Sequence, residues 1–264
     1  MVENRLNPDQ PLESETPAER SATTTTDLLR RMGGRMTRRD ILLAEMTGGH
    51  VHIAHMSAWT TIEAVRQGKS RGVKVTCEVC PHHFTLTDAL LQAPIPYDTN
   101  AKMNPPLREQ RDVDAMIAGI KDGTVDVIST DHAPHHYDEK NVEFDRAPFG
   151  IVGLETAVSI TLDRLVHPGI IGLPRMVELL SVNPAKILRV PGGTLSAGAP
   201  ADITIIAPDL AVKVDKTKLV SKSKNTPYDG WSFKGGVAAT IVGGKVVYAN
   251  QAVETGLQAR LQRA

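Results

Sequence analysis

The sequence predicts an α/β fold: a parallel sheet with helices between its strands, followed by a small β-rich region. Three observations support this prediction. Short apolar segments rich in Val and Ile take turns with helix-like segments over 37–190. These strand segments are almost continuously apolar, as expected when helices cover a parallel sheet on both faces. Beyond Pro191 the sequence changes to Gly, Pro and short β runs, which predicts a separate β segment over 191–264.

Length and composition favour a globular protein that acts on a small molecule. The chain has 264 residues, 41% of them hydrophobic, which is enough for a full domain core. Its 30 basic and 30 acidic residues balance, so we expect neither nucleic acid nor an anionic membrane as a partner. The sequence shows no apolar run near the membrane-spanning length and no secretory signal pattern, so the expected location is the cytoplasm.

The first ordered element is predicted to follow a polar N-terminal tail. Residues 1–36 are rich in Pro, Ser, Thr and Glu, a composition typical of disordered segments. Thr37 and Asp40 then have the spacing of a capping box, and Gly48 with Gly49 is a plausible helix stop. We therefore expect the first helix to begin near residue 37.

The remaining elements follow from periodicity and from turn residues. Alternating apolar and amphipathic segments predict right-handed β-α-β crossovers. The predicted strands cover 50–56, 72–79 and 125–130, and the predicted helices cover 59–69, 108–120, 154–165 and 174–180. The C-terminal segment holds short β runs over 201–207 and 237–248, with Gly243 and Gly244 as a hairpin turn.

Two polar residues stand at the ends of predicted parallel strands, where barrel-type α/β proteins place their reactive groups. Strict alternation puts His55 on one face with Val51 and Ile53, and it puts Asp131 in a row with Val125, Val127 and Ser129. Each strand would then place one row of side chains in the barrel interior, and that row would end in a residue that can bind a metal. The alternative is that Asp131 only caps the next loop and that His55 is a core histidine.

Four other histidines are candidate ligands. His50 and His52 form an H-x-H pair, but they begin their strand and alternation turns them away from His55. We therefore expect them on the exterior or at the bottom of the sheet. His82 and His83 follow the second strand near the same mouth, where we expect a structural or substrate-facing role.

The two cysteines, Cys77 and Cys80, form a C-x-x-C pattern. This spacing is found in zinc and redox sites. However, the segment alternates like a strand, and positions three apart on a strand face opposite sides. We therefore expect neither a disulfide nor a metal shared by the pair.

Several motifs in one order resemble the dihydroorotases of bacterial type I, within the amidohydrolase superfamily. The resemblance extends over about 39–248. Several separate motifs in the same order as in the family are more specific evidence than any single motif. The matching motifs are HIAHMS, EVCPHH, KMNPPLR, TDHAPHHYDEK and APFGIVGLETA, followed by SVNPAKIL and KSKNTPYDG. It implies a metal-dependent (β/α)8 barrel that interconverts (S)-dihydroorotate and N-carbamoyl-L-aspartate in pyrimidine biosynthesis.

The resemblance also implies roles for individual residues. A complete family site holds two zinc ions, and His55 matches a zinc ligand at the end of the sixth barrel strand. Asp131 matches the eighth-strand aspartate, which is both a zinc ligand and the general acid/base. Zinc lowers the pKa of bound water to about 7, which yields a nucleophile for a cyclic amide. The residues that match substrate contacts are Asn104, His135, Phe149 and Gly150.

The sequence departs from the family because the first-strand H-x-H, the bridging aspartate and the fifth-strand histidine have no counterpart in it. We therefore expect a partial barrel, strands six to eight, with a small C-terminal β-sandwich appendage. A catalytic zinc site needs three protein ligands, so His55 and Asp131 alone do not complete one. Recruitment of Cys80 or His82 is an alternative. Three strands also leave open sheet edges.

Three functional hypotheses remain. The first is a dihydroorotase segment that is inactive alone and becomes active where the missing ligands are supplied. The second is a non-catalytic dihydroorotase-like subunit that binds aspartate transcarbamoylase or forms a homo-oligomer. The third, a hydantoinase or allantoinase, is weaker because KMNPPL together with TDHAPH is the dihydroorotase combination.

Overall fold

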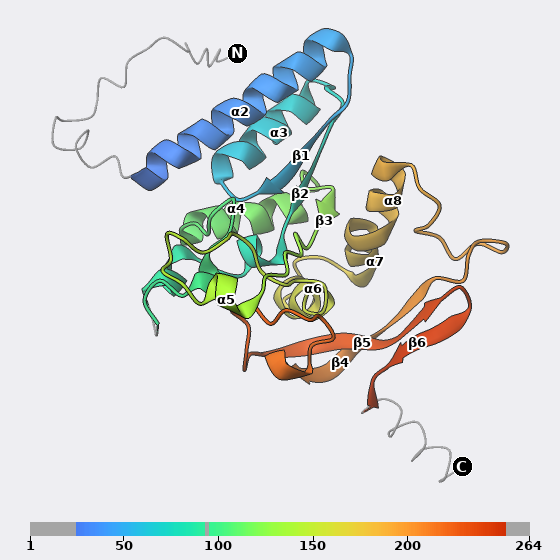
Figure 1. Ribbon diagram of the computed structural model, residues 1–264. Helices are drawn as coiled ribbons and strands as arrows, with labels where there is room; N and C mark the ends of the chain where they lie inside the picture. The colour runs from blue at the N-terminus through green and yellow to red at the C-terminus, as the bar shows by residue number, and fades with distance from the viewer. Residues whose placement is uncertain (1–24, 93–94, 252–264) are drawn as a thin grey trace.

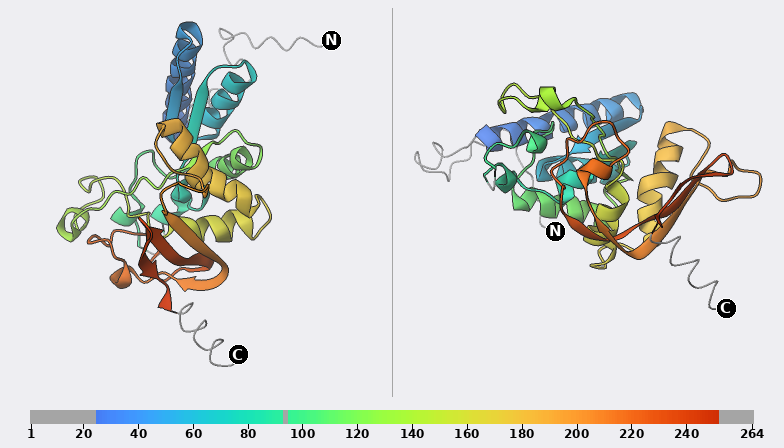
Figure 2. Two further views of the ribbon diagram at one scale, coloured as in Figure 1. Left: turned by 90° about the vertical axis from the view of Figure 1, so that its right-hand side faces the viewer. Right: turned by 60° about the horizontal axis from the view of Figure 1, so that its bottom comes forward.

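The computed structural model describes residues 25–92 and 95–251. The chain forms a small parallel sheet covered by helices, and a separate antiparallel sheet lies at the opposite end of the molecule from helix α2 (Figures 1 and 2). Within the described ranges, no helix has the length and apolar character needed to cross a bilayer.

The parallel sheet has three strands in the order β1-β2-β3, as the sequence predicts. They are β1 (Val51–Met56), β2 (Val75–Val79) and β3 (Val127–Ile128). Buried and half-buried residues alternate along β2. One of its faces therefore packs on the helices, and the other carries the polar residues described below. β3 is much shorter than predicted, because only two residues pair with β2.

Three helices flank the parallel sheet: α2 (Thr25–Thr47), α3 (Trp59–Ser70) and α4 (Gln110–Lys121). Ile41 of α2 and Ile62 and Val65 of α3 are almost fully buried, and burial of such a side chain contributes about 1.5–3 kcal/mol. A Cβ on Gly68 would lie 2.9 Å from Ile41 Cγ2. The glycine thus allows α3 and α2 to pack closely.

Helix α2 begins twelve residues earlier than predicted. Thr37, the predicted cap, lies inside the helix, and its hydroxyl donates to the carbonyl of Gly33 at 3.1 Å. Thr side chains form this bond in helix interiors as well as in caps, so capping-box spacing alone did not fix the boundary. The predicted polar tail is therefore wrong for residues 25–36. Residues 1–24 lie outside the described part of the chain.

A second helical region follows the loops beyond β3 and continues through two π-helical segments. Its elements are α6 (Ala157–Thr161), η4 (Leu162–Val166), α7 (Leu173–Val177), η5 (Glu178–Val182) and α8 (Asn183–Leu188). These confirm the two predicted helices, and the second extends further than predicted. The connecting loops contain short turns: η1 (Pro81–Phe84), η2 (Asp88–Leu91), η3 (Thr99–Ala101), α5 (Tyr137–Lys140) and η6 (Lys216–Lys218).

The C-terminal segment forms one antiparallel sheet in the order β4-β5-β6. Its strands are β4 (Ile203–Lys213), β5 (Ser232–Val242) and β6 (Lys245–Ala249). The predicted hairpin is confirmed, and Gly243 and Gly244 both have positive φ, +55° and +77°, as a type I′ turn requires. A β-sandwich needs two sheets, whereas the described residues of this segment form one.

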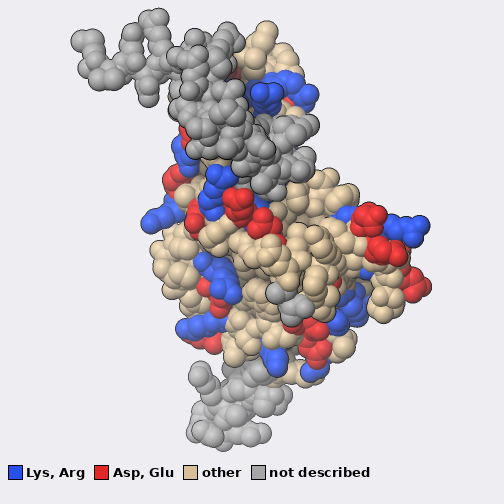
Figure 3. Space-filling view, turned by 90° about the vertical axis from the view of Figure 1, so that its left-hand side faces the viewer, with Lys and Arg blue, Asp and Glu red and all other residues tan. Residues whose placement is uncertain are grey.

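Surface charge follows the balanced composition. On the face shown in Figure 3, basic and acidic side chains are interspersed, with no extended area of one sign. Many of these charges pair locally, as Arg66 does with Glu63 and Asp122, at 2.7 Å in both cases. This face therefore offers no single-sign surface for a polyanion.

Candidate functional site

The structure brings His55 and Asp131 together at the carboxyl edge of the parallel sheet. Their side chains are about one-third exposed, and His55 Nε2 lies 3.7 Å from Asp131 Oδ1. Both residues have positive φ, +50° and +47°, which is uncommon outside glycine. His55 is the second-last residue of β1 and Asp131 lies three residues beyond β3, and at both positions the backbone departs from extended geometry.

Glu78 on β2 holds the imidazole of His55. His55 Nδ1 lies 2.8 Å from Glu78 Oε1, and His52 Nε2 lies 3.2 Å from Glu78 Oε2. Burial alone would raise the pKa of Glu78, but the hydrogen bonds from His52 and His55 outweigh it and hold the pKa at about 2. A carboxylate that accepts from Nδ1 leaves Nε2 of a neutral imidazole free to bind. That nitrogen is the one that faces Asp131.

The prediction that His52 faces away from His55 is wrong. The β1–β2 pairing shifts register between Ile53 and Met56, and such a bulge places an extra residue in one strand. His52 and His55, three positions apart, therefore both contact Glu78. The interior row predicted for this strand breaks after Ile53 for the same reason.

His50 immediately precedes β1 and contacts the same threonine as His52. His50 Nε2 and His52 Nδ1 both lie within hydrogen-bonding distance of Thr76 Oγ1, at 2.9 and 2.8 Å. Thr76 and Glu78, on one face of β2, thus contact three histidines that lie in β1 or just before it. This face of the sheet is polar and half-exposed, in contrast to the buried face of Val75, Cys77 and Val79.

Both cysteines are free and buried, and they contact different residues. The thiol of Cys77 donates to the carbonyl of Thr124 at 3.2 Å, and burial raises its pKa to about 12. Cys80 Sγ lies 3.6 Å from His55 Nδ1, and burial, with Asp131 nearby, raises the pKa of Cys80 as well. His55, Cys80 and Asp131 each offer a ligand atom within 4.8 Å of the others, so the three could hold one metal ion.

The predicted substrate-contacting residues His135, Phe149 and Gly150 lie together in two adjacent loops. His135 Nε2 lies 2.8 Å from the carbonyl oxygen of Phe149. Phe149 is 54% exposed, and the centroid of its ring lies 4.8 Å from Lys102 Nζ. Gly150 is buried, and its N–H donates to the carbonyl of Lys102 at 2.9 Å. The two loops are therefore joined directly at these residues.

Two residues that the sequence did not single out fix this loop pair. Lys140 Nζ donates to the carbonyls of Pro148 and Gly150, and Asn225 Nδ2 donates to those of Gly150 and Ala133. Asn225 lies in the KSKNTPYDG motif, and that motif was the only available signal for its importance. A donor that satisfies two buried carbonyls holds both segments in one register.

Asn104 is exposed and stands before a cis peptide bond to Pro105, two residues beyond Lys102, whose carbonyl accepts from Gly150. Its link to the rest of the site runs through the backbone, because the carbonyl of Pro105 accepts from His83 Nε2 at 2.9 Å. His83 and its neighbour His82 are almost fully buried. This fits the structural alternative given for these two histidines rather than a substrate-facing role.

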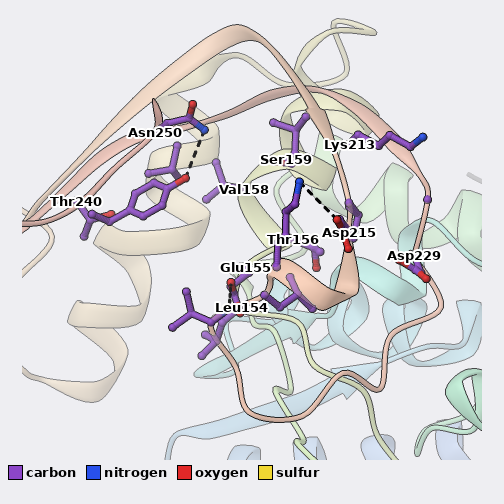
Figure 4. Close-up of a pocket in the computed structure, with 18 residues that line it drawn as sticks. Leu154, Glu155, Thr156, Val158, Ser159, Lys213, Asp215, Asp229, Thr240 and Asn250 are labelled. Carbon is purple, nitrogen blue, oxygen red and sulfur yellow. Dashed lines mark hydrogen bonds and ion pairs between the residues drawn. The ribbon is translucent and has the colours of Figure 1, made fainter. Parts of the chain in front are cut away.

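A separate pocket of about 780 Å³ lies between the start of α6 and the antiparallel sheet (Figure 4). Glu155, Asp215 and Asp229 line it together with apolar side chains such as Leu154. The two carboxylate oxygens of Glu155 accept backbone N–H groups of the loop that follows η6. None of its lining residues belongs to the His55–Asp131 pair, so this pocket is distinct from the candidate site.

Curated dihydroorotases are similar to this chain over most of its length. The dihydroorotase of Geobacter metallireducens is 55% identical over 212 residues, which cover 80% of this chain and 49% of that protein. The dihydroorotase of Pelotomaculum thermopropionicum is 53% identical over 218 residues, 83% of this chain and 50% of that protein. The chain thus spans about half the length of the curated relatives it matches.

Solved structures share the fold. The dihydropyrimidinase of Brevibacillus agri superposes with a TM-score of 0.78 at 24% identity, over 83% of this chain and 49% of that one. The L-hydantoinase of Arthrobacter aurescens gives 0.76 at 28% identity, over 82% and 48%. The model of the amidohydrolase family matches residues 18–247. With most of its length covered by that model, this chain belongs to the amidohydrolase family.

Proposed function

We propose that this chain carries the C-terminal part of a dihydroorotase site, which interconverts (S)-dihydroorotate and N-carbamoyl-L-aspartate. The observation that carries the proposal is the Glu78–His55–Asp131 arrangement, within a chain 50–55% identical to dihydroorotases. On this proposal β1, β2 and β3 are the sixth to eighth strands of a (β/α)8 barrel. The 22–28% identity to hydantoinase structures supports the fold and not the substrate.

The residues present fit one side of a zinc site. His55 presents Nε2 because Glu78 accepts from Nδ1, and Asp131 lies 3.7 Å away. A carboxylate behind a ligating imidazole is typical of zinc centres. Zinc bound there would supply Lewis acidity toward the cyclic amide. Cys80 is a third donor within reach of both residues, but the His55 nitrogen that it contacts, Nδ1, is already bonded to Glu78.

The chain's own groups supply the proton transfer and the substrate contacts. Asp131 accepts a proton from the attacking water and returns it to the leaving nitrogen, which is the two-way role of a general acid/base. Asn104 and His135 bind the substrate carboxylate, and the loop of Phe149 and Gly150 lies over the ring.

We propose that the chain alone is inactive because the described residues offer too few catalytic ligands. A zinc ion with an open position needs three protein ligands, and the proposed set is His55 and Asp131. The β1-β2-β3 sheet also ends in unpaired strands within the described residues, whereas a barrel closes only when its first and last strands pair. The remaining ligands and strands would come from further polypeptide.

A complementation assay tests this proposal. The purified chain is assayed for cyclisation of N-carbamoyl-aspartate, alone and mixed with the N-terminal half of the Geobacter metallireducens dihydroorotase. We expect no turnover from the chain alone and turnover from the mixture, lost when the chain carries Asp131→Asn. Robust turnover by the chain alone would refute the claim that its site is incomplete. Turnover of hydantoin but not of dihydroorotate by the mixture would refute the assignment of dihydroorotate as the substrate.

The same mixture separates the enzyme from a non-catalytic subunit. If no turnover appears although the two polypeptides associate, the proposal fails. Co-purification of the chain with aspartate transcarbamoylase would then support the binding function instead.

A further inference from the structure

A buried cluster of metal-binding groups lies directly behind the candidate site, where β2 runs into the turn η1. Cys80, His82 and His83 are 0%, 2% and 3% exposed. Each offers a ligand atom, and the three atoms lie within 4.8 Å of one another. The two imidazole rings meet edge to face, with centroids 4.2 Å apart. Three donors from four consecutive positions thus converge inside the core.

Two of the ring nitrogens in this cluster have no hydrogen-bond partner among the described residues. They are His82 Nε2 and His83 Nδ1, and both are buried. Nearly all buried polar groups in proteins are paired, so each unpaired nitrogen indicates a missing partner. A histidine that serves only as part of the core would have its buried ring nitrogens hydrogen-bonded. Here two unpaired nitrogens lie beside one sulfur.

The other ring nitrogen of His83, Nε2, is hydrogen-bonded to a backbone carbonyl, as is common for histidines that bind a metal. His83 Nε2 lies 2.9 Å from the carbonyl oxygen of Pro105, and a carbonyl can only accept. Nε2 therefore carries the proton, and Nδ1 is the nitrogen with the free lone pair. A backbone carbonyl that sets the tautomer of a ligating histidine is a common outer contact of zinc.

Burial also keeps both imidazoles ready to bind a cation. It lowers the pKa of His82 well below the ordinary value and the pKa of His83 to about 4. Both rings are therefore neutral near pH 7, as a metal ligand must be. The positive charge of a bound cation would be offset by the Cys80 thiolate, whose proton passes to solvent on binding.

Cys80 is a better partner for these histidines than for His55. Its sulfur lies 3.6 Å from His55 Nδ1, but that nitrogen is already bonded to Glu78 at 2.8 Å. The two unpaired nitrogens of His82 and His83 have no such competitor among the described residues. The sulfur therefore belongs with the buried pair.

We propose that Cys80, His82 and His83 form a buried binding site for one borderline-soft divalent cation, with zinc the best fit, separate from the proposed catalytic ion. Imidazole and thiolate donors select zinc over magnesium and calcium, which prefer oxygen. Zinc bonds of about 2.3 Å to sulfur and about 2.0–2.1 Å to nitrogen require the cluster to contract slightly. This inference does not depend on the proposed reaction.

A cobalt titration tests the site. Co²⁺ is added to the metal-free, full-length chain, and the thiolate-to-cobalt charge-transfer band in the near ultraviolet is followed. We expect the band to saturate at one equivalent, to vanish in Cys80→Ser, and to need more than ten times as much cobalt in His82→Ala or His83→Ala. The matched control is Cys77→Ser, which removes a buried thiol three residues away and should retain the band.

The His55→Ala and Asp131→Asn variants separate this site from the proposed catalytic one, because both should retain the band. Loss of the band in His55→Ala, together with its retention in His82→Ala and His83→Ala, would overturn the inference. Absence of the band from the wild-type chain would overturn it too.

One measurement needs no variant and so does not depend on whether a variant folds. X-ray absorption of the wild-type chain loaded with one equivalent of zinc should show one sulfur and two imidazole ligands. A shell of oxygen and nitrogen alone would refute the site.

Discussion

Replacement of Gly150 by alanine tests how tightly the loop over the proposed site is built. Gly150 has φ +112°, and a Cβ there would lie 2.4 Å from Ala133 Cβ. The unfavourable backbone costs about 1–3 kcal/mol, and overpacking against Ala133 costs a further ~1–3 kcal/mol. Ala133 Cβ is attached to the backbone and cannot rotate away. We therefore expect Gly150→Ala to lower the free energy of unfolding by about 2–6 kcal/mol.

Gly123 supplies the matched control, since it also has positive φ, +86°, but a Cβ added to it would meet no atom within 4 Å. Gly123→Ala should therefore lower the free energy of unfolding only by the cost of the unfavourable backbone conformation, about 1–2 kcal/mol. The two variants are compared by urea unfolding, where a midpoint change at constant slope reports stability. Ala133→Gly should rescue the excess cost of Gly150→Ala in a double-mutant cycle. Equal costs for the two glycine variants, or a cycle without coupling, would refute the close contact.

Three further predictions concern the candidate site. Asp131→Asn should abolish turnover of the complemented enzyme without changing the unfolding midpoint of the chain, because it removes the proton carrier and almost no volume; unchanged turnover would contradict the assigned role. Glu78→Gln should weaken zinc binding by the complemented enzyme by about 10- to 100-fold, as expected for loss of a carboxylate behind a ligand, and equilibrium dialysis measures this affinity. For Lys140, burial and then Lys102 lower the pKa of the side chain from 10.5 to about 8. Above pH 10.5 the amine is neutral in the folded and unfolded states, so protonation costs the fold no stability. As the pH falls to 8 and below, the unfolded state binds a proton more readily than the folded state, and this stability is lost. The stability of the wild-type chain relative to Lys140→Met should therefore rise between pH 8 and 10.5, by on the order of 3 kcal/mol, and a flat difference in urea unfolding would rule the shift out.

The sequence predicted the elements whose signals are local. Val- and Ile-rich runs gave the parallel strands, and Gly243-Gly244 gave the hairpin, since each depends on a short pattern. His55 and Asp131 could be paired because parallel strands end at one edge of a sheet. Topology alone does not give their 3.7 Å separation, because β2 lies between β1 and β3.

What the sequence did not predict depends on departures from regular geometry or on distant contacts. The bulge after Ile53 brings His52 and His55 onto one carboxylate, and strict alternation cannot foresee an extra residue in a strand. Glu78 was overlooked for that reason. The unpaired nitrogens of His82 and His83 are visible only when every buried polar atom can be matched with its neighbours.

Asn225 has a consequence for anyone who wishes to redesign the loops. Its side chain contacts the carbonyls of Ala133 and Gly150, its Oδ1 accepts from the His135 amide, and its own carbonyl accepts from Val152. A loop transplanted from a relative with a different specificity would lose these anchors unless the segment around 225 came with it. The two stretches, far apart in the chain, therefore act as one exchangeable module, and substitutions in them should be selected jointly rather than in turn.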